Sequence, residues 1–425
     1  MVMTEEKFIF SAGIKKKIYY TIGAGILLLV IGIFMAMNGG HHEGQVVAEH
    51  AEAHGGPTWQ LRVIKDLWLN NVFFTGIAIV GVFFVAFNYI AQAGWGVVVK
   101  RVAESFGYFI PVGGVIMILL FVVFNHDLFH WTHHNLYEPG AEFDEILDGK
   151  KGFLNFPFFL IRMVIYFVLW YFIWKSIRTN SLAEDLNADL KYHDKSIFWS
   201  AIFLLVFGVT SSTSAWDWVM SIDPHFFSTM FGWYVLASWF VSGLAMITLV
   251  VVTLKENGYL SVVNSSHLHD LGKFMFAFSI FWSYIWFAQF LLIYYANIPE
   301  ESIYFVERLK NDVYSPIFFM NLFINFAFPF LTLMAAEAKR QAIILKIVAI
   351  AILVGHWFDF YIMMTPPLLK QEGGLDVKIL FIEAGITMVF GGIFFYMILN
   401  GLSKASLVPK NHPMLQESVH HNIYL

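Results

Sequence analysis

Cysteine is absent from this chain of 425 residues. Its absence excludes disulfides, cysteine nucleophiles, cysteine-ligated iron–sulfur clusters and haem attached through a Cys-x-x-Cys-His motif. Charged residues are also scarce, at 13%, whereas hydrophobic residues make up 58% and aromatic residues 18%. A soluble domain of this length does not tolerate that balance, so the composition indicates a polytopic membrane protein. The formal net charge is only −5 and no long basic run occurs, which argues against nucleic acid as a partner.

Ten apolar runs are long enough to cross about 30 Å of hydrocarbon. We predict spans at residues 18–38, 70–93, 103–125, 154–175, 197–220, 227–253, 271–297, 313–337, 342–366 and 378–401. The expected fold class is therefore all-α, with residues 1–401 forming one integral membrane domain. The tail, 402–425, contains Pro409 and Pro413 and few apolar positions, so we expect it to be extended and available to a neighbouring subunit. Lysine and arginine concentrate in alternate loops, which predicts that both termini and this tail are cytoplasmic.

Two helix ends resemble each other. Asp217 precedes Pro224 by seven residues, Asp359 precedes Pro366 by seven residues, and aromatic residues and methionines fill both intervals. This pattern predicts an internal repeat, in which spans two to five and spans six to nine form two four-helix bundles and the first and last spans lie outside them. In residue numbers the two bundles cover about 70–220 and 227–366, and the flanking spans cover about 18–38 and 378–401.

Ionisable residues at membrane depth fall mainly in the half nearer the outer side. An ionisable side chain near hydrocarbon costs on the order of several kcal/mol unless it meets water or a partner, so such residues indicate a function. The candidates are Asp217, Asp223, His225, His356, Asp359, Arg162, Glu383, His126 and His130. The inner half offers mostly neutral groups, among them Ser200, Ser242 and Thr248.

Three roles fit such a layer. A proton pathway needs carboxylates and imidazoles, and histidine has the most suitable unperturbed pKa for relaying protons near neutral pH. A quinol pocket needs an acceptor for each quinol hydroxyl among apolar walls. A structural network would use Arg162 to neutralise one of the acids. We favour the proton pathway and keep the other two as alternatives.

Histidines in the predicted outer loops have spacings that resemble those of metal ligands. They are His41, His42, His50 and His54 in the first loop, and His126, His130, His133 and His134 after the third span. We favour a solvated loop for the first group, and interfacial packing or proton entry for the second. Haem b needs histidines at similar depth on facing helices, and only His356 is deep. We therefore expect no catalytic centre, no metal and no cofactor bound by this chain.

One segment resembles a known family. Residues 214–234 read SAWDWVMSIDPHFFSTMFGWY. This segment, with the number and layout of the spans, resembles the ActF subunits of bacterial alternative complex III, a quinol:electron-acceptor oxidoreductase. Those subunits belong to the NrfD and polysulfide-reductase membrane-anchor superfamily. Within the matching segment the resemblance points to Asp217, Asp223 and His225.

The resemblance implies a multi-pass subunit of the bacterial inner membrane that works with partners. The implied partners are a paralogous NrfD-like subunit, an iron–sulfur protein, c-type cytochromes and, as a further candidate, a terminal oxidase. Haem c and iron–sulfur clusters would lie in those subunits, and menaquinol or ubiquinol would be oxidised beside the paralogous subunit. This chain would contribute a proton route. Two other interpretations stay open: a purely structural anchor, and a proton-coupled secondary transporter, since ten spans and a repeat are also transporter features.

Overall fold

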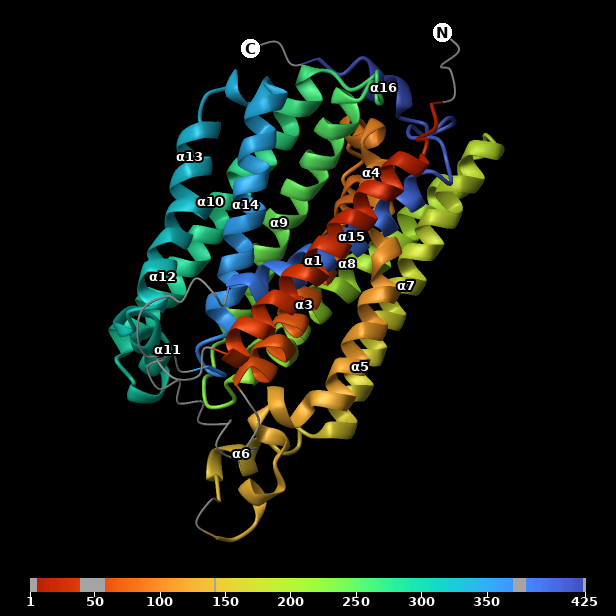
Figure 1. Ribbon diagram of the computed structural model, residues 1–425. Coiled ribbons are helices and arrows are strands. Elements are labelled where there is room, and N and C mark those ends of the chain that lie inside the picture. The colour runs from red at the N-terminus through yellow and green to blue at the C-terminus, as the bar shows by residue number, and fades with distance from the viewer. Residues whose placement is uncertain (1–5, 39–57, 141–142, 370–379, 423–425) are drawn as a thin grey trace.

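The computed structural model describes residues 6–38, 58–140, 143–369 and 380–422. Within these ranges the chain is helical, and its strand-like pairing is a single bridge between Lys7 and Ser406. Ten helical segments are long and apolar enough to cross a membrane, which confirms the prediction of an all-α, multi-pass protein (Figure 1).

In the described part of the chain, twelve α-helices build the ten spanning segments, and three short α-helices lie at the ends of the molecule (Figure 1). The spanning segments are α1 (Ala12–Asn38), α3 (Thr58–Ile90), α4 with α5 (Lys100–Phe106 and Ile110–Leu128), α7 (Phe156–Leu186), α8 (Leu190–Trp218), α9 (Thr229–Glu256), α10 (Ser265–Ala296), α12 with α13 (Tyr314–Leu322 and Phe328–Leu333), α14 (Ala342–Met364) and α15 (Leu380–Leu402). The short helices are α6 (Glu145–Lys150), α11 (Pro299–Lys310) and α16 (Leu415–Val419). We call the end of the molecule that carries α6 and α11 the α6 end, and the opposite end the α16 end.

The helix α3 begins well before the predicted second span. The prediction placed its start at residue 70, whereas the helix starts at Thr58 and takes in Arg62, Lys65 and Asp66, all of which are buried. The start predicted from the apolar run was too late, because these charged residues belong to the helix and pack inside the protein instead of facing water. The observed helix therefore carries buried charges that the prediction left in a loop.

Two helices, α3 and α9, lie at the centre of the molecule. In each, 83% of the most apolar stretch is buried, compared with 11% in α1. The central helix α3 packs against α5, α8 and α9, and α9 packs against α10 and α14. The peripheral α1 packs along α15, and a Cβ atom on Gly25 would lie only 2.7 Å from the Gly385 carbonyl oxygen. Small residues thus allow these two helices to approach closely.

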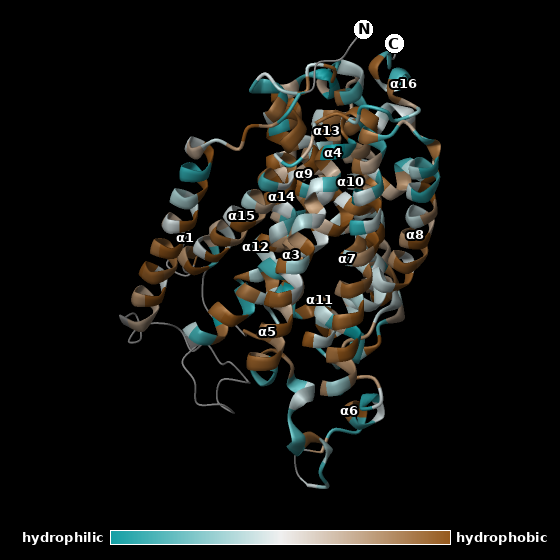
Figure 2. Cartoon of the chain, turned by 90° about the vertical axis from the view of Figure 1, so that its right-hand side faces the viewer, coloured by the Kyte–Doolittle hydropathy of each residue, from teal (hydrophilic) through white to brown (hydrophobic). Residues whose placement is uncertain are grey.

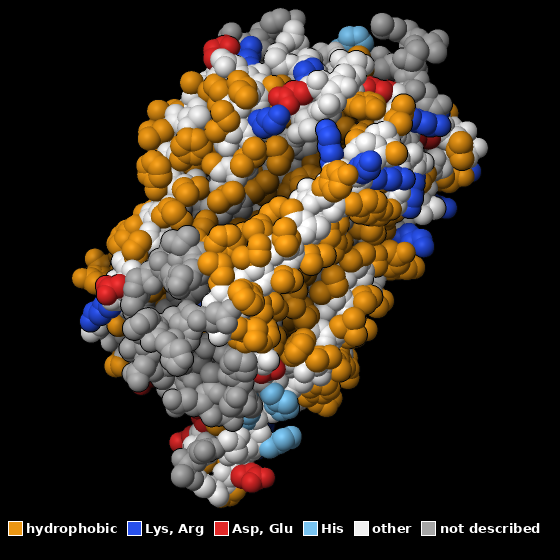
Figure 3. Space-filling model, in the orientation of Figure 1, with side chains coloured by type: hydrophobic (Ala, Val, Ile, Leu, Met, Phe, Trp, Pro, Cys, Tyr) orange, Lys and Arg blue, Asp and Glu red, His pale blue; other side chains and the backbone are white. Residues whose placement is uncertain are grey.

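The outer surface is apolar over most of the molecule's length. Figure 2 shows hydrophilic residues gathered mainly at the two ends, and Figure 3 shows hydrophobic side chains covering the face between them. Leu205 is 76% exposed and Val168 is 57% exposed. A continuous exposed apolar surface of this kind fits a lipid environment.

The C-terminal tail is not extended, so that expectation was wrong. It folds back over the α16 end of its own chain, where the Ser418 hydroxyl donates to the Trp95 carbonyl oxygen at 2.7 Å. His421 Nε2 lies 2.7 Å from an oxygen of Asp270, and the Leu407 N–H donates to the Glu6 carbonyl oxygen at 2.9 Å. The few apolar residues of the tail are also buried, among them Leu407 at 0% and Leu415 at 7% exposure, so this segment packs on its own chain through both apolar and polar contacts.

Candidate functional site

Asp217 forms an ion pair with Arg162 inside the protein. Asp217 lies in the last turn of α8, and the Arg162 guanidinium donates to its two oxygens at 2.9 and 2.7 Å. The Tyr166 hydroxyl donates to the same carboxylate at 3.1 Å, and the remaining Arg162 nitrogen donates to the Phe153 carbonyl oxygen at 3.0 Å. Both charged side chains are buried. Paired donors on a planar guanidinium match a carboxylate closely, so this acid is neutralised by its neighbour.

Asp359 has a different environment. Its carboxylate accepts hydrogen bonds from four uncharged groups: the hydroxyls of Tyr234 and Ser238, the Trp282 indole N–H at 2.9 Å and the Asn321 amide at 2.7 Å. It is fully buried, and among the residues that the structure describes it forms no ion pair with lysine or arginine. Tyr234 and Ser238 are one turn apart on α9, which places both hydroxyls on one face. The acid is therefore solvated by neutral donors alone.

His356 lies beside Asp359 on α14. Its Nδ1 atom is 3.6 Å from an Asp359 oxygen, and its ring meets the Trp282 ring edge-on at 5.3 Å between centroids. His356 is fully buried, and neither ring nitrogen has a hydrogen-bond partner within the described part of the chain. A buried imidazole next to a carboxylate can accept a proton and form an ion pair with it. His356 and Asp359 are thus neighbours without a fixed counter-charge, whereas Asp217 is held by arginine.

Glu383 lies near a second buried acid that the sequence did not reveal. Lys65 Nζ is 2.7 Å from an Asp66 oxygen, 3.9 Å from a Glu383 oxygen and 3.4 Å from the Thr365 hydroxyl oxygen. The side chains of Lys65, Asp66 and Glu383 are each at most 2% exposed. The Lys65 ammonium therefore lies near two carboxylates, those of Asp66 and Glu383. The sequence prediction missed Lys65 and Asp66 because it placed this part of α3 in a loop.

Indole hydrogen bonds connect α3 to the neighbourhoods of Asp217 and Asp359. The Trp68 indole donates to the Trp218 carbonyl oxygen at 2.8 Å, next to Asp217. The Trp357 indole donates to the Asn70 side-chain oxygen at 3.0 Å, next to His356. Asp217, Asp359 and the pair of Asp66 and Glu383 thus lie at or near the half of α3 that is closer to the α6 end.

The remaining predicted site residues lie at the surface of the α6 end. His225 is 45% exposed and its Nε2 atom is 2.5 Å from an Asp144 oxygen, while Asp223 follows the end of α8 in a short turn. His126 contacts the Thr132 hydroxyl at 3.1 Å, and the ring of His130 lies 5.7 Å from that of His133. The histidines at positions 41, 42, 50 and 54 lie outside the described residues. The structure therefore does not bring His225, Asp223, His126 and His130 into the buried layer.

Asp144 links the loop that carries α6 to the segment after α8. Its carboxylate accepts hydrogen bonds from the backbone N–H groups of Ile146 and Leu147 at 3.0 Å and caps α6. Partial burial opposes ionisation, but the Leu147 N–H and the His225 ring outweigh it and lower the pKa of Asp144 below its usual value. The Lys150 ammonium also donates to the Pro224 carbonyl oxygen at 2.6 Å, so two contacts fix this loop.

The half of the molecule nearer the α16 end also contains a buried charged cluster, which the sequence did not reveal. Near the α16 end, a Glu104 oxygen is 2.5 Å from Arg178 and the other accepts from the Ser181 hydroxyl at 2.8 Å. Lys100 and Arg101 lie 3.5 and 3.7 Å from the same carboxylate, and all four charged residues are buried. Sequence reasoning placed the cations in loops and overlooked Glu104. The spacing of Lys100, Arg101 and Glu104, one turn apart at the edge of an apolar run, was the available signal.

Comparison with known proteins leaves the family open. No family model matches the sequence, and no curated protein matches it. The functional argument therefore rests on the residues and their geometry.

Proposed function

We propose that this chain is a cofactor-free integral membrane subunit of a respiratory quinol:electron-acceptor oxidoreductase of the alternative complex III type, and that it contributes a transmembrane proton pathway. The observation that carries the pathway is Asp359, a fully buried acid held by four uncharged donors beside His356. Ionisable groups at membrane depth without a fixed counter-charge are typical of proton relays.

Buried hydroxyl groups also occur on α9 between Asp359 and the α16 end, where those of Ser242 and Thr248 donate to backbone carbonyl oxygens of their own helix. Ser242 lies one turn beyond Ser238 on α9, Thr248 lies further along the same helix, and all three are fully buried. The distance along the helix from Tyr234 to Thr248 is about 21 Å at 1.5 Å per residue. Glu104 and its neighbours supply ionisable groups at the α16 end of the molecule. Polar groups are thus available over much of the thickness of a membrane.

The first half of the chain gives the pathway less support. On α8, the buried positions between Ser200 and Thr210 are Phe203 and Phe207. These ten residues correspond to an apolar interval of about 15 Å. Asp217 is also neutralised by Arg162. We therefore assign the pathway to the second half of the chain and a structural role to the Arg162–Asp217 pair.

The helix contacts support the finer architecture that the sequence predicts. The helices α3, α5, α7 and α8 pack on one another in one group, and α9, α10, α12, α13 and α14 do so in a second. The two groups meet where α3 and α8 pack against α9, and α1 pairs with α15. We identify these groups with bundle one, bundle two and the flanking spans. The bridge between Lys7 and Ser406 holds the two terminal segments at the same end, which we assign to the cytoplasm of a bacterial cell.

Co-purification tests the assignment to a respiratory complex. Tagged protein isolated from its native membrane in mild detergent should bring with it c-type haem, an iron–sulfur protein and a paralogous membrane subunit. The isolated chain should show no haem absorbance. A chain that leaves the membrane alone, or that carries one haem per molecule, would contradict the proposal and would favour a transporter or a cytochrome.

A second candidate function, quinol binding, rests on a different observation. A cavity of about 450 Å³ lies between α3, α14 and α15, and its walls include Trp357, Phe358, Met388 and Phe395. Glu383 and Thr387 also line it, and neither the Glu383 carboxylate nor the Thr387 hydroxyl has a hydrogen-bond partner among the described residues. A carboxylate at one end of an apolar cavity can accept a hydrogen bond from a quinol hydroxyl.

The binding of a quinol analogue tests this second candidate function. A fluorescent quinol analogue should bind the purified protein, and Glu383→Gln should weaken that binding because the amide is a poorer acceptor than the carboxylate. The exposed Glu138→Gln should leave it unchanged. Equal binding by the wild type and Glu383→Gln would remove the cavity as a quinol site.

A further inference from the structure

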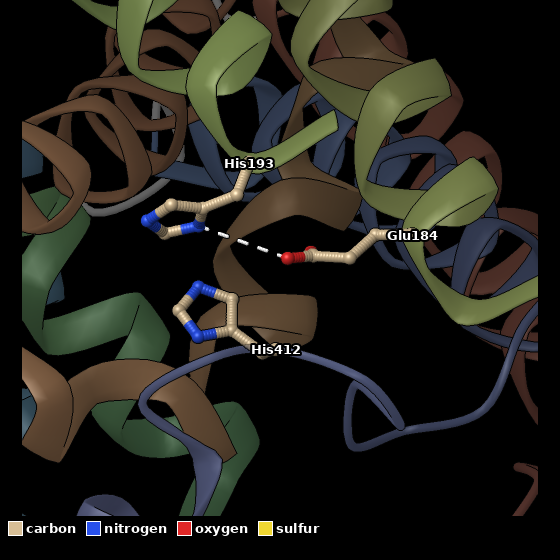
Figure 4. A group of neighbouring side chains, drawn as sticks. All are labelled: Glu184, His193 and His412. Atoms are coloured by element: carbon tan, nitrogen blue, oxygen red, sulfur yellow. Dashed lines mark ion pairs between the residues drawn. The ribbon is translucent and has the colours of Figure 1, made fainter. Parts of the chain in front are cut away.

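Three potential metal ligands meet at the α16 end, close to Lys100 and Glu104 and at the opposite end from Asp217, Asp359 and Glu383. Glu184 lies in the last turn of α7, His193 in the first turn of α8 and His412 in the tail. One donor atom from each lies within 4.8 Å of the other two. Figure 4 shows the carboxylate and both imidazole rings turned toward a common space, with each side chain coming from a different segment.

The donor atoms of this cluster are buried and incompletely bonded. Glu184 is 2% exposed, His412 7% and His193 9%. Neither Glu184 oxygen has a hydrogen-bond partner among the described residues, and the same holds for His193 Nδ1. The distance between His193 Nδ1 and the nearer Glu184 oxygen is 3.7 Å, too long for a hydrogen bond. Burial of a carboxylate without donors is costly, so this arrangement points to a ligand that supplies the missing interactions.

We propose that Glu184, His193 and His412 form a binding site for a first-row divalent transition metal of the zinc class. Two imidazoles and one carboxylate are a common ligand set for zinc. Tetrahedral coordination at zinc bond lengths places donor atoms about 3.4 Å apart, close to the 3.7 Å between His193 and Glu184. Small side-chain rotations would bring the third donor to this distance.

A small cavity lies beside two of the three ligands. Its volume is about 10 Å³, and Tyr89, Lys100, His193 and His412 are among the residues that line it. This space is close to what one water molecule needs. A water bound there would lie next to both imidazole rings.

The charges near the site set its affinity. The Lys100 ammonium lines the same cavity and donates to the Tyr89 hydroxyl at 2.6 Å. The Met414 N–H donates to His412 Nδ1 at 3.3 Å, a long hydrogen bond that a metal bound at this nitrogen would replace. Lys100 also repels a divalent cation, and we expect Lys100→Gln to strengthen metal binding.

The metal would fasten the tail to the turn between α7 and α8. Just before His412, the Lys410 N–H donates to an Asp185 oxygen at 2.9 Å and the Asn411 amide donates to the Glu184 carbonyl oxygen at 3.0 Å. A metal bound by His412 and Glu184 would hold the tail in place and so stabilise these two hydrogen bonds. This role goes beyond the proposed proton pathway and does not depend on it.

Metal analysis of the purified full-length chain tests the proposal. Protein stripped with a chelator, then dialysed against zinc, should retain one more equivalent of zinc in the wild type than in Glu184→Gln, His193→Ala or His412→Ala. The matched control is His420→Ala, which removes an exposed histidine of the same tail whose ring bonds the Gln416 carbonyl oxygen. The other histidines are unchanged in every variant, so their background binding cancels.

Two further measurements keep the test independent of folding. Zinc should protect the tail of the stripped wild type from proteolysis but should not protect the tail of Glu184→Gln. Cobalt should give the visible absorption of a tetrahedral site in the wild type and in His420→Ala. None of the three ligand variants should show this absorption. Equal zinc content in the wild type and all three ligand variants would overturn the proposal. A loss of zinc from His420→Ala as large as that from His412→Ala would overturn it as well.

Discussion

The Arg162 guanidinium holds the Asp217 carboxylate through two hydrogen bonds of 2.9 and 2.7 Å, with both side chains buried. Asp359, the acid with which the sequence pairs it, contacts no arginine or lysine in the described structure and is held by neutral donors. The two acids therefore respond differently to the loss of charge. Asp217 is part of an ion pair, whereas Asp359 can change its protonation without leaving a cation unpaired.

Asp217→Asn should destabilise the protein. The substitution leaves Arg162 buried without its anion, and breaking a buried ion pair typically costs about 3–5 kcal/mol. We expect a lower yield of monodisperse protein and a lower midpoint of thermal unfolding in detergent. The double variant Arg162→Gln with Asp217→Asn should recover part of the loss, because no charge stays unpaired. A single variant as stable as the wild type would show that the pair does not stabilise the fold.

Glu104→Gln should weaken the α16 end of the molecule. Glu104 is the carboxylate shared by Lys100, Arg101 and Arg178, so its neutralisation leaves three buried cations with fewer anions. A loss of about 3–5 kcal/mol is expected by the same reasoning. Thermal unfolding measures it, and Glu145→Gln, at an exposed position, is the control. Equal stability of both variants would contradict a structural role for Glu104.

The loop that carries α6 should loosen in acid. The pKa of Asp144 is lowered in the folded protein, so its contribution to stability is present above the unfolded value of about 3.9 and is lost as the pH falls through the folded value. Hydrogen exchange of the Ile146 and Leu147 amides should therefore accelerate below about pH 4, beyond the intrinsic effect of pH. In Asp144→Asn the excess acceleration should disappear. An unchanged profile in that variant would mean that another group controls the loop.

The sequence predicted the number of spanning helices but not all of their ends. Apolar runs identify the stretch of a helix that meets lipid or core, and all ten were found near their predicted places. Apolar runs do not predict the helical turns with charged residues that pack inside the protein. Lys65 and Asp66 in α3, and Arg178 in α7, were assigned to loops for this reason, although all are buried.

The sequence indicated which residues to consider for a site but few of their contacts. Of the residues chosen for their depth in the predicted spans, Asp217, Asp359, His356 and Glu383 are buried, whereas Asp223, His225, His126 and His130 are not. The similar spacing of Asp217 and Asp359 from a proline suggested equivalent helix ends, yet Asp217 lies in the last turn of α8 while Asp359 lies five residues before the end of α14. Partners such as Trp282 and Asn321 come from other helices, and no local pattern reveals them.

Proton release by the assembled complex in liposomes tests the central claim most directly. Asp359→Asn keeps the size of the side chain and removes the titratable group, although its amide NH2 replaces one of the two oxygens that accept hydrogen bonds here. In complexes that assemble normally, the number of protons released per electron should fall. The exposed Asp312→Asn, at the same end of the molecule, should leave the ratio unchanged. An unchanged ratio in a normally assembled Asp359→Asn complex would contradict the proton pathway.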